Sequence, residues 1–255
     1  MSEGVVAAGA YDGEAAGAIA ARLNVPRVVA LETTSSTLDV AHALAGEGAP
    51  AGTLVIAESQ TAGRGRSGKR WTSAPGSGIW LTIIERSLDP ATLSLLALRL
   101  GIAAATALQP FATGPIGIKW PNDLYVGGGK LAGILVEARW RESAPDWVAI
   151  GMGINVVAPP GIDGAAELAR DVSRLAVLEA LVPALRSAAA RSGELADDEL
   201  ATLATRDIAR GRRAISPGQG IVDGVSGEGE LLLRLPNGTL VAHRAGSLVF
   251  AEEDS

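Results

Sequence analysis

The sequence of 255 residues contains no cysteine, and this absence excludes disulfide bonds, thiolate metal ligands and cysteine nucleophiles. The two histidines, His42 and His243, lie far apart in the sequence, so a zinc site is not expected. We interpret His42 as an ordinary helix residue of the surface or core. Aromatic residues make up only 4% of the chain, so a tryptophan beside a polar motif stands out as a candidate contact surface.

Long apolar segments are scarce as well. The N-terminus has no basic region followed by a long apolar core, and no uninterrupted apolar run reaches about 18 residues, so neither a secretion signal nor a membrane span is predicted. Hydrophobic residues make up 47% and charged residues 20% of the chain, which is typical of a folded, soluble domain. We therefore expect a cytoplasmic protein without membrane contact. The net charge of -6 gives no general nucleic-acid signal, so cations matter only where they cluster.

The pattern of apolar runs predicts an α+β fold, a mixed sheet with helices. Strands are expected at 27–32, 53–57, 78–84, 116–119 and 147–151, with a hairpin formed by 124–126 and 131–137. Helices are expected at 14–23, 38–45, 91–108, 173–191 and 197–210. After these come short apolar runs separated by glycines, which predict a small β-barrel of about 40 residues. The predicted organisation is an N-terminal segment 1–25, a main domain 26–210 and a C-terminal barrel 211–255.

The most informative segment is the loop 63–71, which has the sequence GRGRSGKRW and which we call the basic loop. Like charges repel one another and glycine loses more backbone entropy than other residues, so closing this loop is costly unless an anionic ligand offsets the cost. Lys119 adds a further cation at the end of a predicted strand. Together these residues indicate an enzyme pocket that binds a carboxylate and a phosphate.

The basic loop also matches two nucleotide-binding motifs by chance. Its glycines form G-x-G-x-x-G, with Glu85 at a suitable distance for a ribose contact, but that motif requires a helix directly after the loop. The segment 72–76 contains proline and glycine and is not expected to be helical. The run 63–69 matches G-x-x-x-x-G-K, but Arg70 replaces the hydroxyl residue that would bind magnesium. On its own, the loop remains compatible with a solvated basic segment or a nucleic-acid contact.

Five blocks together resemble biotin–protein ligase in order and spacing over about residues 27 to 255. They are Gln60, the basic loop, KWPND at 119–123, GKLAGIL at 129–135 and GMGIN at 151–155. The resemblance implies a class II synthetase-like mixed sheet with helices, followed by a small SH3-like β-barrel. It further implies that the enzyme condenses biotin with ATP, as its magnesium complex, to biotinyl-AMP. The biotin is then transferred to one lysine of a biotin carboxyl carrier protein.

The resemblance also assigns roles to individual residues. The positions that match biotin contacts are Ser36, Thr37, Leu38, Gln60, Arg64, Gly65, Arg66, Trp71 and Lys119. The positions that match nucleotide contacts are Arg64, Arg66, Lys119, Lys130 and Asn155, and the expected catalytic residues are Lys119 and Arg64. Cations suit this chemistry because adenylation brings a carboxylate against a phosphate. Leu38 departs from the family, which usually has asparagine there. No magnesium ligands are assigned, and no tightly bound prosthetic group is expected.

Two alternatives remain open at this point. A lipoate or octanoate–protein ligase would use a related fold, although the KWPND block and the basic loop favour biotin. A nucleic-acid-binding module would use only the basic loop. About 25 residues precede the main domain, which is too short for a DNA-binding domain, so we expect a monofunctional ligase without nucleic-acid contact. The protein is expected to be a monomer or a homodimer.

Overall fold

The structure is a computed structural model that describes residues 6–251. Residues 1–5 of the predicted N-terminal segment and 252–255 of the predicted C-terminal barrel lie outside the described residues. Within the described part, eight strands form one large sheet. In spatial order they are β1 (Val6–Ala7), β4 (Val28–Thr34), β5 (Thr53–Gln60), β6 (Gly78–Glu85), β10 (Ala144–Asn155), β9 (Gly129–Arg141), β8 (Asp123–Val126) and β7 (Gly117–Lys119). Only the β4–β5 pair is parallel, so the predicted mixed sheet is confirmed.

The predicted helices are also present. They are α1 (Ala16–Leu23), α2 (Thr37–Gly46), α3 (Leu93–Leu108), α4 (Arg174–Ala189) and α5 (Asp197–Arg206), and a short hairpin of β2 (Ala10–Tyr11) and β3 (Glu14–Ala15) precedes α1. Short 3-10 turns lie at Arg66–Gly68, Pro90–Thr92 and Gln109–Phe111. The prediction for the helix at 197–210 is wrong at its end. After Arg206 the chain leaves the helix because Asp207 accepts from the amide of Ala209, and Ile208 pairs with Ile118 of β7.

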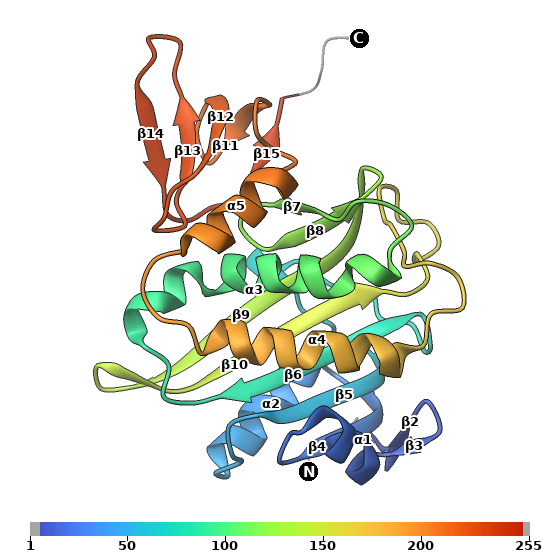
Figure 1. Ribbon diagram of the computed structural model, residues 1–255. Coiled ribbons are helices and arrows are strands. Elements are labelled where there is room, and N and C mark those ends of the chain that lie inside the picture. Colours follow the sequence, from blue (N-terminus) through green and yellow to red (C-terminus); the bar gives the residue numbers. More distant parts are fainter. Residues whose placement is uncertain (1–5, 252–255) are drawn as a thin grey trace.

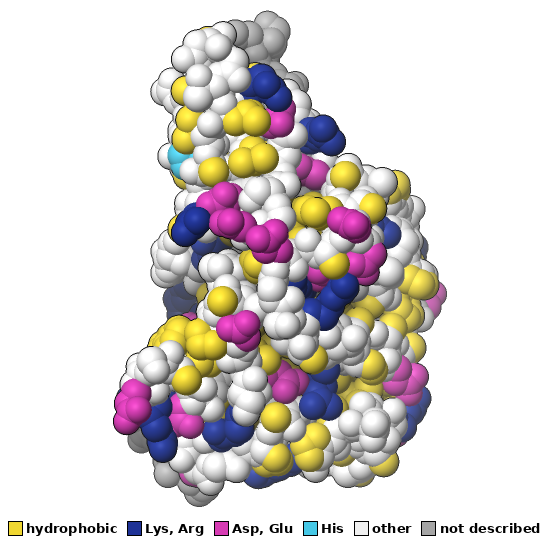
Figure 2. All heavy atoms as spheres, turned by 60° about the vertical axis from the view of Figure 1, so that its left-hand side comes forward, with side chains coloured by type: hydrophobic (Ala, Val, Ile, Leu, Met, Phe, Trp, Pro, Cys, Tyr) yellow, Lys and Arg dark blue, Asp and Glu magenta, His cyan; other side chains and the backbone are white. Residues whose placement is uncertain are grey.

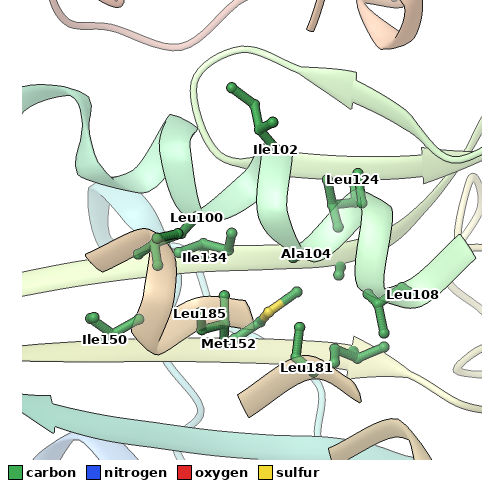
Figure 3. Packing of buried hydrophobic residues seen from close by; sticks show 14 of the residues in the cluster. Leu100, Ile102, Ala104, Leu108, Leu124, Ile134, Ile150, Met152, Leu181 and Leu185 are labelled. Atoms are coloured by element: carbon green, nitrogen blue, oxygen red, sulfur yellow. The ribbon is translucent and has the colours of Figure 1, made fainter. Parts of the chain in front are cut away.

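The sheet separates two layers of helices (Figure 1). On one face, α3 and α4 pack across β9 and β10, where α3 residues such as Leu100 meet Ile134 and α4 residues such as Leu185 meet Met152 (Figure 3). On the other face, α2 covers an apolar patch of its own. Successive side chains of β5 point to opposite faces of the sheet. Leu54 and Ile56 belong to the apolar cluster on the α3 and α4 face, whereas Val55 and Ala57 belong to the cluster on the α2 face.

One apolar segment departs from expectation. Pro90–Phe111, which contains α3, is long and apolar enough to cross a membrane, although the sequence was not expected to contain such a segment. Its most apolar window is 61% buried inside the molecule, and Leu96, Leu100 and Leu108 are fully buried against the sheet. The apolar character of α3 is therefore that of a core helix.

The C-terminal region forms a separate five-stranded antiparallel sheet within the described residues. Its strands, in spatial order, are β14 (Leu240–His243), β13 (Leu231–Arg234), β12 (Gly220–Val225), β11 (Arg213–Ser216) and β15 (Val249–Phe250). No pairing among the described residues joins β14 to β15, so the antiparallel sheet is confirmed while the closed barrel stays a prediction. Apolar side chains show on the outside of this region in Figure 2, and Ile221 and Leu240 are among the exposed ones.

Candidate functional site

A cavity of about 500 Å³ lies on the α2 side of the large sheet, where the sheet meets the C-terminal residues 247–250. Every residue predicted to contact a ligand lines it. These residues are Ser36, Thr37, Leu38, Gln60, Arg64, Gly65, Arg66, Trp71, Lys119, Lys130 and Asn155. The chain contains only three lysines, Lys69, Lys119 and Lys130, and all three line this cavity. Their rarity was a signal in the sequence that the motif search did not use.

The basic loop folds back on itself at the cavity rim. The amide of Gly65 donates to the carbonyl of Lys69 (2.8 Å), and the amide of Trp71 donates to the carbonyl of Gly63 (2.9 Å). A Cβ at Gly63 would lie 2.5 Å from the carbonyl oxygen of Trp71, so no larger residue fits there without movement. No helix follows the loop within 72–77, which confirms that the dinucleotide and P-loop motifs are coincidental.

Trp71 lies on a floor made of two glycines that pair across β9 and β10. Gly133 is the register partner of Gly153. A Cβ at Gly153 would lie 2.6 Å from Nε1 of Trp71, and a Cβ at Gly133 would lie 3.0 Å from its ring. The glycines therefore let the indole approach the sheet. Sequence analysis noted both glycines as motif members, but their paired position appears only in the sheet.

Gly153→Ala is expected to lower the free energy of unfolding by about 1–3 kcal/mol, because the added methyl overlaps Trp71 and forces the ring or strand to move. Gly101→Ala is a matched control. Its added methyl would find its nearest atom at 3.9 Å, an ordinary contact, and alanine suits the helix better than glycine. Urea unfolding of both variants measures the difference. Equal stability of Gly153→Ala and the wild type would contradict the glycine-floor interpretation.

Lys119 ends β7 beneath the C-terminal sheet. Its Nζ lies 5.0 Å from the ring centre of Phe250 and 5.7 Å from that of Tyr125, so two aromatic faces flank the ammonium group. Burial lowers the pKa of Lys119 below its ordinary value, and the carboxylate of Asp123 opposes that shift in part. Nearby Lys130, Arg212 and Lys69 add to the lowering. The site therefore holds a partly desolvated ammonium that an anionic ligand would stabilise.

The four predicted ligand-binding cations fall into two pairs. Arg64 and Lys130 have carboxylate partners, since Arg64 pairs with Glu137 (2.5 Å) and Lys130 with Asp123 (2.8 Å). Among the described residues, Lys119 and Arg66 make no ion pair with a carboxylate. Of the four predicted cations, Lys119 and Arg66 are therefore the two whose charge no ion pair compensates, and Lys69 and Arg70 of the basic loop line the same cavity.

Arg66 bridges two regions of the chain. Its Nη1 donates to Oδ1 of Asn122 (3.1 Å), and its Nη2 donates to the carbonyl of Gly246 (3.1 Å) in the C-terminal region. Asn122 in turn donates to the carbonyl of Ile134 (2.8 Å), which fixes its orientation. The basic loop is therefore attached to the KWPND block and to the C-terminal sheet through one guanidinium group.

The polar residues at the start of α2 bind one another. Ser36 caps the helix, because its side-chain oxygen accepts from the amide of Leu38. Oε1 of Gln60 accepts from the amide of Thr37 (2.9 Å), and its Nε2 donates to Ser73 (2.9 Å). The Leu38 side chain is buried and lies close to Gly151.

Asn155 ends β10 and holds the opposite rim. Its Nδ2 donates to the carbonyls of Lys130 (3.2 Å) and Ala166 (3.1 Å). The amide of Lys130 donates to the carbonyl of Gly164 (2.6 Å), so the segment 159–165 is fastened beside the cavity. The Asn155 side chain thus shapes the site through the backbone.

His42 lies on α2 with a partly buried side chain, as expected, but its partners were not predicted. His42 connects Trp147 of β10 to Glu137 of β9, and Glu137 in turn pairs with Arg64 of the basic loop. Sequence reasoning also missed Glu137 and Trp147, because their spacing of 95 to 105 residues from His42 carries no local pattern.

Comparison with known proteins identifies the family. Residues 30–155 match the biotin/lipoate A/B protein ligase family. The biotin–[acetyl-CoA-carboxylase] ligase of Paracoccus denitrificans is 31% identical over 82% of this chain and 93% of its own length. The bifunctional ligase/repressor BirA of Bacillus subtilis is 42% identical over 51% of this chain, and the chain spans only 40% of that relative's length.

A solved structure agrees with these sequence matches. The biotin protein ligase from Aquifex aeolicus, in complex with biotin and ATP, has a TM-score of 0.70 and 26% sequence identity. The comparison covers 89% of this chain and 100% of that one. The chain therefore belongs to the biotin/lipoate A/B protein ligase family, among its biotin–protein ligases.

Proposed function

We propose that this protein activates biotin with ATP to form biotinyl-AMP and pyrophosphate, and then transfers biotin to one lysine of a biotin carboxyl carrier protein domain. The observation that carries the proposal is the single cavity that collects all residues assigned to biotin and nucleotide, together with every lysine of the chain. Its volume of about 500 Å³ is in the range of small-molecule sites. The names of the Paracoccus and Aquifex relatives support the same chemistry.

The first step joins two anions, since a carboxylate oxygen of biotin attacks the α-phosphorus of ATP and pyrophosphate leaves. Lys119 and Arg66 supply the positive charge that offsets their repulsion, because neither is neutralised by a carboxylate in the described structure. The mixed anhydride then presents an activated carbonyl. In the second step the amine of the carrier lysine attacks that carbonyl, the C–O bond to AMP breaks, and the lysine proton is released.

The remaining assigned residues act by contact and position. In this proposal Trp71 forms an apolar wall for the biotin ring system. Lys130, whose Nζ lies 5.3 Å from the ring centre of Trp71, contacts the nucleotide. Ser36, Thr37 and Gln60 hold the start of α2 where the biotin head group binds. In this proposal Leu38 and Gly65 shape that part of the cavity, Asn155 holds the nucleotide side, and Arg64 stands at the rim.

The proposal extends to partners and architecture. In this proposal magnesium enters as the ATP complex, and no protein ligands are assigned to it. We propose a cytoplasmic enzyme, a monomer or homodimer, with a catalytic domain over 26–210 and a small SH3-like barrel over 211–255. The boundary at 211 falls between α5 and β11.

The alternatives have less support. Lipoate and octanoate ligation is not favoured by the relatives, which are named for biotin. A nucleic-acid-binding module needs an extended basic surface. On the face shown in Figure 2, Lys and Arg are interspersed with Asp and Glu. Two of the four cations of the basic loop, Arg64 and Arg66, instead contact partners in the protein, Glu137 and Asn122.

ATP–pyrophosphate exchange tests the proposal. The purified protein is incubated with ATP, magnesium and labelled pyrophosphate, with biotin, lipoate, octanoate or no acid. Of these four conditions, only biotin is expected to support exchange. Exchange requires reversible formation of an adenylate, and we propose that biotin is the acid that this enzyme activates. Exchange supported by lipoate or octanoate, and not by biotin, would overturn the substrate assignment. Transfer of labelled biotin to a carrier domain then tests the second step.

A further inference from the structure

Four side chains form a continuous series of contacts that ends in the basic loop: Trp147, His42, Glu137 and Arg64. Only Arg64 has a role in the proposed reaction. Arg64 leaves the loop and pairs with Glu137 of β9 (2.5 Å) and Asp39 of α2 (3.4 Å). Oε2 of Glu137 also accepts from His42 of α2 (2.9 Å). The same carboxylate oxygen therefore holds Arg64 on one side and His42 on the other.

The hydrogen-bond pattern fixes the tautomer of His42. Nε1 of Trp147 lies 2.9 Å from Nδ1 of His42, and an indole N–H can only donate. Nδ1 must therefore accept, so the ring proton sits on Nε2 and is donated to Glu137. In this arrangement Trp147 orients His42, and His42 orients Glu137.

This series of contacts is held by regular structure and is partly shielded from water. Glu137 and Trp147 lie on neighbouring strands, where Glu137 is the register partner of Ala149. His42 projects from α2, and the side chains of His42 and Glu137 are 27% and 32% exposed. Arg64 is 38% exposed, so solvent partly screens its ion pair with Glu137, and the hydrogen bond from His42 adds a second constraint on the Glu137 carboxylate.

We propose that Glu137 is a positioning residue of the cavity, which holds Arg64 and with it the basic loop, and that His42 and Trp147 set the orientation of Glu137. The inference rests on the proposed function for its effect on biotin. The ion pair with Glu137 holds Arg64 where it can contact biotin. The same ion pair keeps the basic loop, which also carries Arg66 and Trp71, in its closed shape. Loss of the Glu137 charge frees Arg64 and loosens this loop.

A double-mutant cycle tests the coupling. Glu137→Gln is expected to raise the KM for biotin in pyrophosphate exchange about tenfold while kcat changes little, because position rather than folding is lost. In an Arg64→Ala background the same substitution should have almost no further effect. A merely structural defect would instead lower the active fraction, and so kcat, in both backgrounds. Equal KM effects with and without Arg64 would overturn the proposal.

Glu179→Gln is the matched control, since this carboxylate also pairs with an arginine, Arg22, but lies on α4, which contributes no residue to the cavity lining. It should leave KM and kcat unchanged. An effect equal to that of Glu137→Gln would contradict a specific role for Glu137.

Two readouts do not depend on catalysis. Lys69 and Arg70 are exposed in the basic loop, so trypsin should cut there faster in Glu137→Gln than in the wild type or in Glu179→Gln. Nitrogen NMR should show the Nε2-protonated tautomer of His42 in the wild type, and Trp147→Phe should release that preference. An unchanged cleavage rate, or the Nδ1-protonated tautomer in the wild type, would sink the positioning proposal. Absence of biotin-dependent exchange in the wild type would refute only the proposed function.

Discussion

Lys119→Ala is expected to slow formation of biotinyl-AMP by about 10²-fold or more, the scale of one lost electrostatic donor in a preorganised site. Lys119 makes no ion pair with a carboxylate in the described structure, its side chain is half-buried, and two aromatic rings flank its Nζ. In such a site a cation interacts more strongly with the developing charge of the reacting phosphate than it would in water. Folding should survive, because the ammonium group is not part of the apolar core.

The pH dependence gives a second measure of the same residue. Burial lowers the pKa of Lys119, so in the free enzyme its charge is lost at a lower pH than for an exposed lysine. The value of kcat/KM, which reports on the free enzyme, should therefore fall on the alkaline side earlier than kcat, because bound anions favour the charged form. In Lys119→Ala this alkaline limb should be absent.

Single-turnover formation of biotinyl-AMP at saturating biotin and ATP measures the rate, and a thermal melt checks folding. Arg141→Ala is a control, because it removes a cation whose side chain is 78% exposed at the far end of β9. It should leave the rate unchanged. Near-normal turnover of a folded Lys119→Ala enzyme would refute the catalytic role.

Arg99→Leu is expected to lower the free energy of unfolding by about 3–5 kcal/mol, because it removes one partner of a buried ion pair. Arg99 lies in the middle of α3 with a fully buried side chain, and its Nε donates to Glu199 of α5 (2.9 Å). Its Nη2 donates to the carbonyls of Gly193 (3.1 Å) and Glu194 (2.6 Å). Without the guanidinium group, the Glu199 carboxylate and these carbonyls lose their buried donor.

This ion pair also supports the placement of the C-terminal sheet. The amide of Leu195, next to the carbonyls that Arg99 holds, donates to the carbonyl of Gly227 (2.7 Å). Residues 247–250 of the same region line the cavity. We therefore expect Arg99→Leu to weaken ligand binding even at temperatures where the large sheet stays folded.

Urea unfolding at neutral pH measures the loss of stability. The double variant Arg99→Leu/Glu199→Leu is expected to regain much of it, because replacing both charges removes the uncompensated carboxylate. Arg141→Ala is a milder comparison, because its side chain is 78% exposed and its ion pair with Asp146 lies at the surface, away from Arg99 and Glu199. A loss for Arg99→Leu no greater than for Arg141→Ala would contradict the buried-pair argument.

The composition of the site was accessible from the sequence alone. Gln60, the basic loop, Lys119, Lys130 and Asn155 lie at strand ends or in loops, and the local alternation of apolar residues predicted those strands correctly. Residues that follow neighbouring strands come together once the sheet forms. The resemblance to biotin–protein ligase assigned motifs spread over about a hundred residues to one site, and the individual residues that it named line one cavity.

The tertiary structure alone decided how those residues are paired. Arg64 forms an ion pair with Glu137, 73 positions away. Arg66, two residues later, donates to a carbonyl 180 positions away and has no carboxylate partner in the described structure. The two glycines beneath Trp71 lie opposite each other only because of the register of β9 against β10. That the apolar helix α3 belongs to the core is likewise shown only by its packing in the main apolar cluster. Periodicity reports the backbone over a few residues. Contacts across such separations depend on sheet register and helix packing, which no local pattern encodes.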